Sequence, residues 1–414
     1  MSHIEVARDR PLDGIRVLDL SRVVAGPHCT RLLAELGADV IKLEPPDGDQ
    51  TRAGRGAGHP SPPGFVQLNK SKRLIAVDLA QEEGRTLVRR LAGAVDVLIE
   101  NFRPGVMQSW GLDYDSLAPD NPTLVYVSIS GYGQTGAWRE RRAYAPFVHG
   151  EAGYLHTAAQ LRAEPVEHDP MSVADLAAAK DAAIALLAAL LQRGRTGRGQ
   201  HIDISLAHSI LYLNEFAAGL LSEAKPPRSG STAQALFTTS DDQTFSAGNP
   251  VSSEVFATLC RSFGCPELID DERFADSGAR RQRRAEVIET LQAALLELDG
   301  IDHVEAVLAE AGLAVGRIRR VIDVPATAWA IERGAVVTAR VDGADDVALP
   351  SAPWRFSGAV DQAPHDLGTF GGDNDAVLAE LLGLDAQEIE GLYGSGVLRR
   401  DRQDMPASGS SGGA

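Results

Sequence analysis

Short apolar stretches alternate with helix-like segments through the first half of the chain, and this alternation limits the fold more than any other feature. The stretches typical of buried strands are residues 15–20, 40–43, 74–79, 95–99, 124–129 and 201–206. Helical patterns at residues 29–36 and 82–92 separate some of them. Such alternation favours a mostly parallel sheet covered by helices, because parallel strands need crossover connections. The predicted fold class is therefore α/β.

The character of the chain changes after about residue 222. Residues 223–233 are rich in Pro, Ser and Gly and are predicted to form a linker. Val287, Leu291 and Leu295 then follow helical spacing, which indicates a smaller domain. The predicted organisation is a large domain from 1–222, linker and small domain from 223–330, a return to the large domain from 331–400 with a last helix at 375–382, and a disordered tail from 401–414.

Charge and composition exclude several classes of protein. The 414 residues carry a net charge of −17, whereas a nucleic-acid-binding protein needs a basic face. The three cysteines are too few for a disulfide framework, and no apolar run reaches the roughly 18 residues of a membrane span. The polar first residues lack the apolar core of a signal peptide. We expect a cytoplasmic protein without nucleic-acid or membrane partners.

One carboxylate, Asp175, opens a long helix that begins near Val173 and ends near Gly197. Two interpretations fit this position. Ser172 and Asp175 have the spacing of a capping box, which is a structural role. Alternatively, the helix N-terminus keeps Asp175 ionised, and a carboxylate so placed can attack a carbonyl. Every residue from 182 to 191 is apolar, so we expect this helix to be buried on all sides.

Two basic clusters, Lys70–Arg73 and Arg139–Arg142, lie beside predicted strands. Solvated surface charge explains either cluster alone. Their placement also suits a phosphorylated ligand, since ligands of open α/β sheets gather at the strand ends.

Several common catalytic patterns are absent from the sequence. The glycines near Gly26 and from Gly131 to Gly136 lack the spacing and following helix of a dinucleotide-binding motif. There is no HExxH or His/Cys cluster, and no GxSxG nucleophile elbow. The sequence thus argues against a nicotinamide cofactor, a metal site and an α/β-hydrolase.

Taken together, the motifs resemble the class III coenzyme A transferases, a family that also contains α-methylacyl-CoA racemase. The resemblance runs from about Pro11 to Leu398. The segments that carry it are residues 11–20, 25–27, 36–44, 48–52, 69–73, 101–105, 131–136 and 196–200.

The resemblance implies a Rossmann-like large domain with a smaller α+β domain, in an interlocked homodimer. Asp175 matches the catalytic aspartate, which would form an anhydride with the acyl group and then a thioester with coenzyme A. The implied partners are an acyl-CoA, which brings the coenzyme A, and a carboxylic acid; no metal is implied. The positions matching coenzyme A contacts are Val77, Asp78, Leu79, Ala80, Asn101, Phe102 and Arg103. A further stretch, which contacts coenzyme A or the acyl group in the family, is matched by Arg142, Ala143, Tyr144 and Ala145.

Two alternatives remain beside CoA transfer. An acyl-CoA racemase or isomerase needs a histidine base, but Tyr144–Ala145 stands where the racemases carry their histidine–aspartate pair. An unperturbed phenol has a pKa of about 10 and is a poor substitute; nearby His149 could serve if the register shifts. The other alternative is a protein that binds coenzyme A without turnover.

Overall fold

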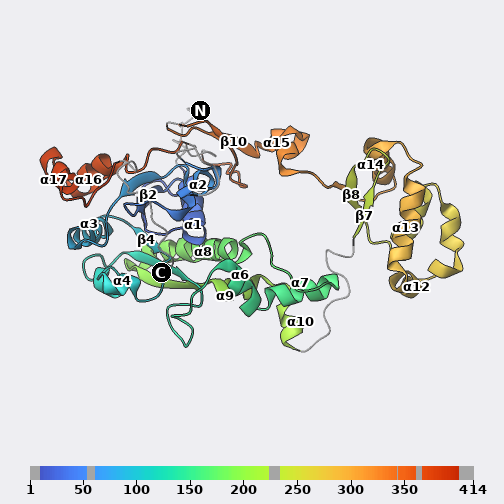
Figure 1. The fold of residues 1–414 in the computed structure, drawn as a ribbon, viewed down its shortest axis with the longest axis horizontal. Coiled ribbons are helices and arrows are strands. Elements are labelled where there is room, and N and C mark those ends of the chain that lie inside the picture. Colours follow the sequence, from blue (N-terminus) through green and yellow to red (C-terminus); the bar gives the residue numbers. More distant parts are fainter. Residues whose placement is uncertain (1–9, 54–60, 223–233, 343, 360–365, 401–414) are drawn as a thin grey trace, which may run out of the picture. The chain divides into compact units, whose positions relative to one another are not determined.

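The computed structural model describes residues 10–53, 61–222, 234–342, 344–359 and 366–400 (Figure 1). The chain divides into two compact units. The large unit combines the chain up to Thr157, residues Val166–Ala217, and the chain from Ile331 onward. The small unit consists of Ala158–Pro165 and Ala218–Ala330. The predicted linker at 223–233 and the predicted tail at 401–414 lie outside the described residues.

A parallel sheet forms the centre of the large unit. Its strands are β1 (Arg16–Asp19), β2 (Asp39–Glu44), β3 (Arg73–Ala76), β4 (Val97–Glu100), β5 (Val125–Ser130) and β6 (Gln200–Ser205). They are ordered β3-β2-β1-β4-β5-β6, and each neighbouring pair is parallel. The order reverses beside β1, as in doubly wound α/β sheets. The α/β class and the mostly parallel sheet predicted from the sequence are confirmed.

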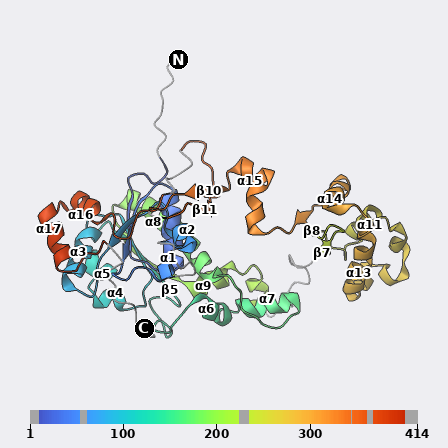
Figure 2. The same ribbon diagram turned by 45° about the horizontal axis from the view of Figure 1, so that its top comes forward.

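Helices cover both faces of this sheet, because successive side chains of a strand point to opposite faces. Val17 packs in one core with α1 (Ala25–Glu35) and α8 (Val173–Thr196), which lie side by side. Leu18, the next residue, packs in the opposite core with α3 (Glu82–Ala92), α16 (Asn374–Leu382) and α17 (Ala386–Gly394). Figure 2 shows these three helices together on their face of the sheet. The chain after residue 382 thus continues into α17, one helix beyond the last one predicted.

The long helix α8 is buried along one stripe only. Ala178 and Ala182 are fully buried against the sheet side, whereas Ile184 and Leu191 are 66% and 72% exposed. The prediction that residues 182–191 are buried on all sides is therefore wrong for this chain. A helix that covers one face of a sheet buries only the residues facing that sheet, whatever the rest of its composition.

The other elements of the large unit connect and flank this core. They are η1 (Gln50–Ala53), α2 (Pro63–Asn69), α4 (Val106–Ser109), α5 (Tyr114–Leu117), α6 (Ala145–Glu151), α9 (Leu206–Leu213), β10 (Val336–Ala339) and β11 (Val347–Pro350). β10 and β11 form an antiparallel pair, and Phe65 of α2 packs in the same cluster as Leu349 of β11. The helix α7 (Tyr154–Arg162) begins in the large unit.

The small unit has its own sheet and its own core. Its three-stranded sheet has the order β7-β8-β9, from β7 (Ala235–Thr238), β8 (Thr244–Ala247) and β9 (Gly316–Arg317). Phe237, Phe256 and Leu291 share its core. Its α-helices, with the boundary helix α15, are α10 (Ala217–Leu221), α11 (Ser253–Ser262), α12 (Ser277–Gln282), α13 (Arg284–Leu295), α14 (Gly300–Glu310) and α15 (Ala328–Arg333). Short 3-10 turns are η3 (Pro266–Asp270), η4 (Glu272–Phe274) and η5 (Val321–Ala326).

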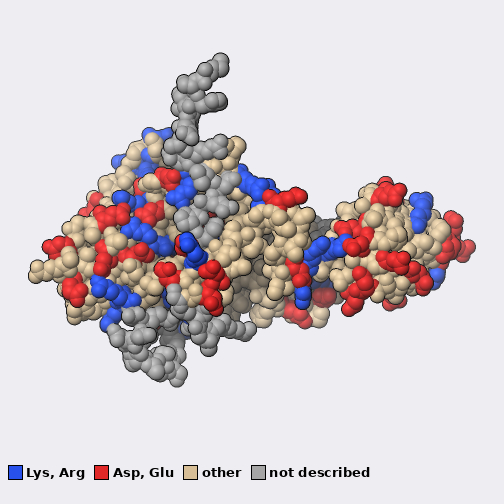
Figure 3. Space-filling model, turned by 90° about the horizontal axis from the view of Figure 1, so that it is seen from above, with Lys and Arg blue, Asp and Glu red and all other residues tan. Residues whose placement is uncertain are grey.

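The surface is charged with both signs. Figure 3 shows Lys and Arg interspersed with Asp and Glu over one face of the molecule, which is typical of solvated surface. Within the described ranges, no helix combines the length and the hydropathy that a bilayer span requires.

Candidate active site

The predicted site residues come from four segments around the sheet of the large unit. Residues 77–80 follow β3, residues 101–103 follow β4, and residues 142–145 lie in the connection after β5. Asp175 is in the first turn of α8, whose last turn leads through a short connection into β6. Parallel strands end at one edge, and a helix leading directly into β6 starts toward that same edge. The four segments therefore gather at the carboxyl edge, where open α/β sheets bind ligands.

Asp175 is partly buried, and no hydrogen bond or ion pair from the described residues holds its carboxylate. Ser172 makes no side-chain capping bond, so the capping box that the sequence allowed does not form. Burial alone raises the pKa of Asp175 to about 6. The carboxylate is thus ionised at neutral pH but more basic than an ordinary aspartate. Such a group suits nucleophilic attack better than structural capping.

His149, the residue weighed as a racemase base, is fully buried on α6. Its Nε2 accepts a hydrogen bond from the backbone N–H of Ala174 at 3.0 Å. Burial lowers the pKa of His149. One ring nitrogen is therefore occupied by backbone, and the imidazole is not open to solvent as a base acting on a substrate would need to be.

The segment from Arg142 to Ala145 begins α6. Arg142 is exposed and Ala143 packs against Gly131, where an added Cβ would lie 2.1 Å from the Cβ of Ala143. Glycine at 131 is thus required for this close approach. Tyr144 is the exposed N-terminal cap residue of α6, and Ala145 is buried.

The arginines near Arg142 are engaged with acidic neighbours. Arg139 pairs with Glu140 at 3.1 Å, and Arg141 pairs with Glu151. The guanidinium of Arg141 also lies 4.6 Å from the ring centre of Trp138. These contacts fit the interpretation of solvated surface charge for Arg139 and Arg141.

Asn101 fastens the loop after β4 to the loop after β1. Its Oδ1 accepts from the N–H of Arg22, and its Nδ2 donates to the C=O of Arg22, both at 2.7 Å. The guanidinium of Arg22 lies over the ring of Phe102, 4.7 Å from its centre. The side chain of Asn101 is thus occupied by backbone, while Arg103 beyond it is exposed.

The turn after β3, residues 77–80, is held by backbone contacts. Val77 is fully buried and forms an isolated bridge with Leu398, and the N–H of Asp78 donates to the C=O of Val397 at 2.9 Å. The Asp78 carboxylate accepts from the N–H of Ala80 at 2.9 Å. Leu79 is buried and Ala80 is exposed, so the side chain of Ala80, unlike those of Val77 and Leu79, is open to solvent.

A pocket of about 210 Å³ opens beside Arg103, on the face of the sheet opposite α8. Glu100, Ser128 and His201 line it, with Ser128 Oγ 2.9 Å from His201 Nε2. Burial raises the pKa of Glu100 to about 7. Sequence reasoning missed these three residues, because single polar residues inside apolar strands form no recognisable motif.

The basic residues Lys70 and Lys72 lie inside the large unit, paired with carboxylates. Nζ of Lys70 is 2.8 Å from Glu35, and Nζ of Lys72 is 3.1 Å from Asp19. All four side chains are almost inaccessible to solvent. Both interpretations of the first cluster, solvated surface charge and contact with a phosphorylated ligand, are therefore wrong for these two lysines.

Asp19 is held by several hydrogen bonds within this buried network. It accepts hydrogen bonds from the N–H of Ser21 at 2.9 Å and from Thr30 Oγ1 at 2.6 Å. Burial raises the pKa of Asp19, but Lys72, Lys42 and these hydrogen bonds outweigh the burial and keep it below its ordinary value. Burial also lowers the pKa of Lys72, to about 8, against the attraction of Asp19.

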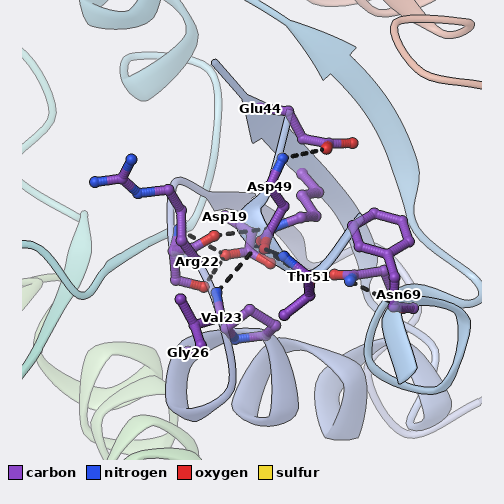
Figure 4. A network of polar contacts seen from close by, with 12 residues as sticks. Asp19, Arg22, Val23, Gly26, Glu44, Asp49, Thr51 and Asn69 are labelled. Carbon is purple, nitrogen blue, oxygen red and sulfur yellow. Dashed lines mark hydrogen bonds and ion pairs between the residues drawn. The ribbon is translucent and has the colours of Figure 1, made fainter. Parts of the chain in front are cut away.

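Asp49 extends the network to the loop after β1 (Figure 4). Its Oδ2 lies 3.1 Å from Lys42 Nζ and 3.3 Å from the N–H of Val23, and its own N–H donates to Glu44 at 2.9 Å. Val23 has φ of 69°, a left-handed conformation that is costly for a β-branched residue. The hydrogen bonds between Asp49 and the N–H of Val23, and between Asn101 and the backbone of Arg22, hold the strained loop in this conformation.

No cluster of three potential metal ligands occurs in the described parts of the chain. Cys29, Cys260 and Cys265 are buried free thiols, and burial raises their pKa values. Raised thiol pKa values disfavour the reactive thiolate. The three cysteines are therefore poor candidate nucleophiles, and Asp175 stays the candidate predicted from the sequence.

Comparison with known proteins identifies relatives over most of the chain. Residues 12–374 match the family model described as CoA-transferase family III. The chain is 33% identical over 409 residues to succinyl-CoA–D-citramalate CoA-transferase of Chloroflexus aurantiacus, covering 94% of this chain and 98% of that protein. It is 33% identical over 401 residues to succinyl-CoA:glutarate CoA-transferase of Mus musculus, covering 94% and 91%.

A solved structure agrees in fold. The crystal structure of a CAIB/BAIF family protein from Brucella suis matches with a TM-score of 0.78 and 34% sequence identity. The match covers 90% of this chain and 100% of that chain.

Proposed function

This chain belongs to CoA-transferase family III, and we propose that it moves coenzyme A from succinyl-CoA to a second dicarboxylic acid by covalent catalysis at Asp175. Transfer of coenzyme A between an acyl-CoA and a carboxylic acid is the activity for which these relatives are named. The observation that carries the mechanism is the carboxylate of Asp175, unpaired within the described chain and with its pKa raised to about 6 by burial. The donor, the acceptor and the covalent steps are the proposal.

The reaction runs through two exchanges on Asp175. The carboxylate attacks the thioester carbonyl of the donor, forming a mixed anhydride and releasing the coenzyme A thiolate. The thiolate then attacks the aspartyl carbonyl, which forms an aspartyl-CoA thioester and releases the donor acid. The acceptor carboxylate attacks this thioester, giving a new anhydride and the thiolate again. Attack of the thiolate on the acyl carbonyl releases the new acyl-CoA and restores Asp175.

The position of Asp175 supports these steps. The N-terminus of α8 favours a negative charge, so the carboxylate stays available as a nucleophile at neutral pH. Burial keeps it more basic than an ordinary aspartate, which favours attack. The same withdrawal from water limits hydrolysis of the anhydride and the thioester.

Coenzyme A is proposed to lie along the carboxyl edge of the sheet, which would then act as a Rossmann-like platform. Residues 77–80, Asn101, Phe102, Arg103 and residues 142–145 surround this edge. Ala80 and Arg103 are exposed there. Asn101 instead binds the backbone of Arg22 and so holds the loop after β1 in place. Arg103 supplies positive charge for a phosphate.

The dicarboxylic substrates are inferred from the relatives. The two relatives are named for succinyl-CoA with D-citramalate and with glutarate. An anionic acyl group needs a cation near the nucleophile. Arg142 is exposed and no side-chain contact is found for it among the described residues, unlike Arg139 and Arg141 beside it. We assign Arg142 to the distal carboxylate of the substrate.

We propose assembly into an interlocked homodimer, which the family resemblance implies, and the exposed apolar residues of α8 and α9 support a surface for association. Ile184 and Leu191 of α8, and Tyr212 and Leu213 of α9, are 55% to 82% exposed. Exposed apolar surface of this kind marks protein interaction sites. Light scattering should then give twice the 44.0 kDa chain mass, and dilution should not release a folded monomer. An active monomer would refute the proposed dimer but would not bear on the proposed covalent catalysis at Asp175.

The function is tested with succinyl-CoA and glutarate as substrates. We expect glutaryl-CoA to form, with Asp175→Ala folded, able to bind coenzyme A and inactive. An isomerase would instead exchange the α-hydrogen of an acyl-CoA for deuterium without any acceptor acid. A binding protein would show neither reaction. Normal turnover by Asp175→Ala would overturn the proposed mechanism.

A further inference from the structure

The first turn of α8 is capped from another helix. The backbone N–H groups of a first turn have no partner within their own helix, and Ser172 offers no side-chain bond. The N–H of Ala174 instead donates to Nε2 of His149 on α6, at 3.0 Å. Ala174 is fully buried and directly precedes Asp175. The imidazole therefore fixes the peptide group between Val173 and Ala174, one residue before the nucleophile.

This contact defines the protonation of His149. A backbone N–H can only donate, so Nε2 must carry a lone pair and the proton of the neutral ring sits on Nδ1. The titratable groups around the ring are Asp169 and His168, which precede α8, and Tyr154 on α7. Burial lowers the pKa of His149, and Asp169 opposes this only in part. The ring that accepts the N–H of Ala174 is therefore the neutral form.

Stability alone does not favour a histidine here. Nδ1 is buried and has no hydrogen-bond partner in the described part of the chain. A buried donor that is left without a partner is destabilising. Residues that break the rule of satisfied buried polar groups concentrate at functional sites. The one bond that the ring does make is the bond to Ala174.

We propose that His149 is the positioning residue of the nucleophile: its neutral imidazole holds the N–H of Ala174 and so fixes the direction and burial of Asp175. This inference rests on the proposed role of Asp175. Loss of the contact frees the first turn of α8, lets Asp175 move toward water, and misplaces it relative to the thioester. A misplaced reacting group lowers kcat by about 10- to 100-fold, while substrate binding elsewhere is kept.

Matched variants separate positioning from packing. In His149→Gln the amide oxygen reaches the place of Nε2 and can accept from Ala174. In His149→Asn the shorter amide lies at the place of Nδ1 and cannot reach it. Val148→Ala removes buried apolar volume from the same helix without touching Ala174. Binding of coenzyme A and the unfolding transition of each variant establish that it is folded.

The experiment measures kcat, KM and the pH dependence of kcat/KM for each variant. We expect His149→Asn to lose about 10- to 100-fold in kcat with little change in KM. The acidic limb of the kcat/KM profile of His149→Asn should move from a pH of about 6, the pKa of the buried Asp175, toward the ordinary pKa of an aspartate. In His149→Gln and Val148→Ala the acidic limb of the pH profile should stay where it is in the unmodified protein. His149→Gln should also keep most of the kcat of the unmodified protein. Equal activity of the Asn and Gln variants, or an unmoved limb in His149→Asn, would overturn the proposal. Turnover by Asp175→Ala would instead refute the proposed function itself, which keeps the two failures distinguishable.

Discussion

Lys72 and Asp19 form an ion pair of 3.1 Å in which neither side chain is accessible to solvent. Lys72 directly precedes β3, and Asp19 is the last residue of β1. These two strands are separated in the sheet by β2. Nζ of Lys72 also donates to the C=O of Pro27 in the first turn of α1. Lys72 therefore links β1 to α1, the two elements that flank the loop containing Val23.

Removing one partner of this pair should be costly. Lys72→Met would leave Asp19 buried without its cation, at a cost of about 3–5 kcal/mol in the free energy of unfolding. The matched control is Arg340→Met, which breaks an exposed pair with Asp366 and should cost at most about 1 kcal/mol. Urea unfolding of both variants measures the difference. Similar small costs for the two would show that the buried network does not stabilise the large unit.

The activity should fall in acid because the nucleophile must be ionised. Burial raises the pKa of Asp175 to about 6, so its protonated, inactive form dominates below that pH. We expect kcat/KM to rise with pH through about 6 and then level off. The measurement is a pH profile with an acyl-CoA whose acyl group is uncharged, compared with the pH dependence of coenzyme A binding to Asp175→Ala, which reports the phosphate monoester that titrates near about 6. A profile that stays level down to about 4, the ordinary aspartate range, would contradict the burial of Asp175.

Neutralising Asp175 should stabilise the protein while abolishing turnover. The pKa of Asp175 is about 6 when folded and 3.8 in the reference state, so the charge disfavours folding at every pH above about 6. Asp175→Asn should therefore raise the free energy of unfolding at neutral and basic pH by about 1–3 kcal/mol. As the pH falls from 6 to 3.8, the folded protein takes up the proton first and the gain disappears. Denaturant unfolding at several pH values measures this. A variant that is less stable throughout would indicate a structural carboxylate.

Arg142→Ala should discriminate between anionic and neutral acyl groups. If Arg142 holds the distal carboxylate, kcat/KM for succinyl-CoA should fall by about 10- to 150-fold, equivalent to about 1.5–3 kcal/mol. Butyryl-CoA, which lacks that carboxylate, should be spared. Arg141→Ala is the control, since Arg141 is paired with Glu151. Equal losses for both substrates would reassign Arg142 to a phosphate of coenzyme A. No loss at all would leave it a solvated surface charge.

The sequence predicts the sheet well because its signals are strong and local. Apolar stretches bounded by charged or turn residues locate all six strands to within a few residues, and α3 has the predicted bounds of residues 82–92. The start of α1 is missed by four residues, because Gly26 and Pro27 read as a turn. Proline needs no N–H partner in the first turn, so the helix includes it.

The candidate site is less predictable because its key contacts join distant segments. Lysines at 70 and 72 read as surface charge, since nothing local shows that Glu35 and Asp19 meet them inside the fold. His149 has no motif, and its partner Ala174 offers only a backbone N–H. The sequence also does not predict that Ile184 and Leu191 are exposed, since an apolar run does not show which side of the helix faces the sheet. The position at the start of a long helix singled out Asp175, and the family resemblance favoured the nucleophile over the capping box.

Chemical trapping of Asp175 tests the central claim most directly. The protein is incubated with an acyl-CoA donor and hydroxylamine, digested, and analysed by mass spectrometry. We predict a hydroxamate on the peptide that contains Asp175, because hydroxylamine intercepts the anhydride or the aspartyl-CoA thioester. The modification should require the donor and should abolish turnover as it accumulates. Normal turnover with Asp175 unmodified, or a hydroxamate on another carboxylate, would contradict the account.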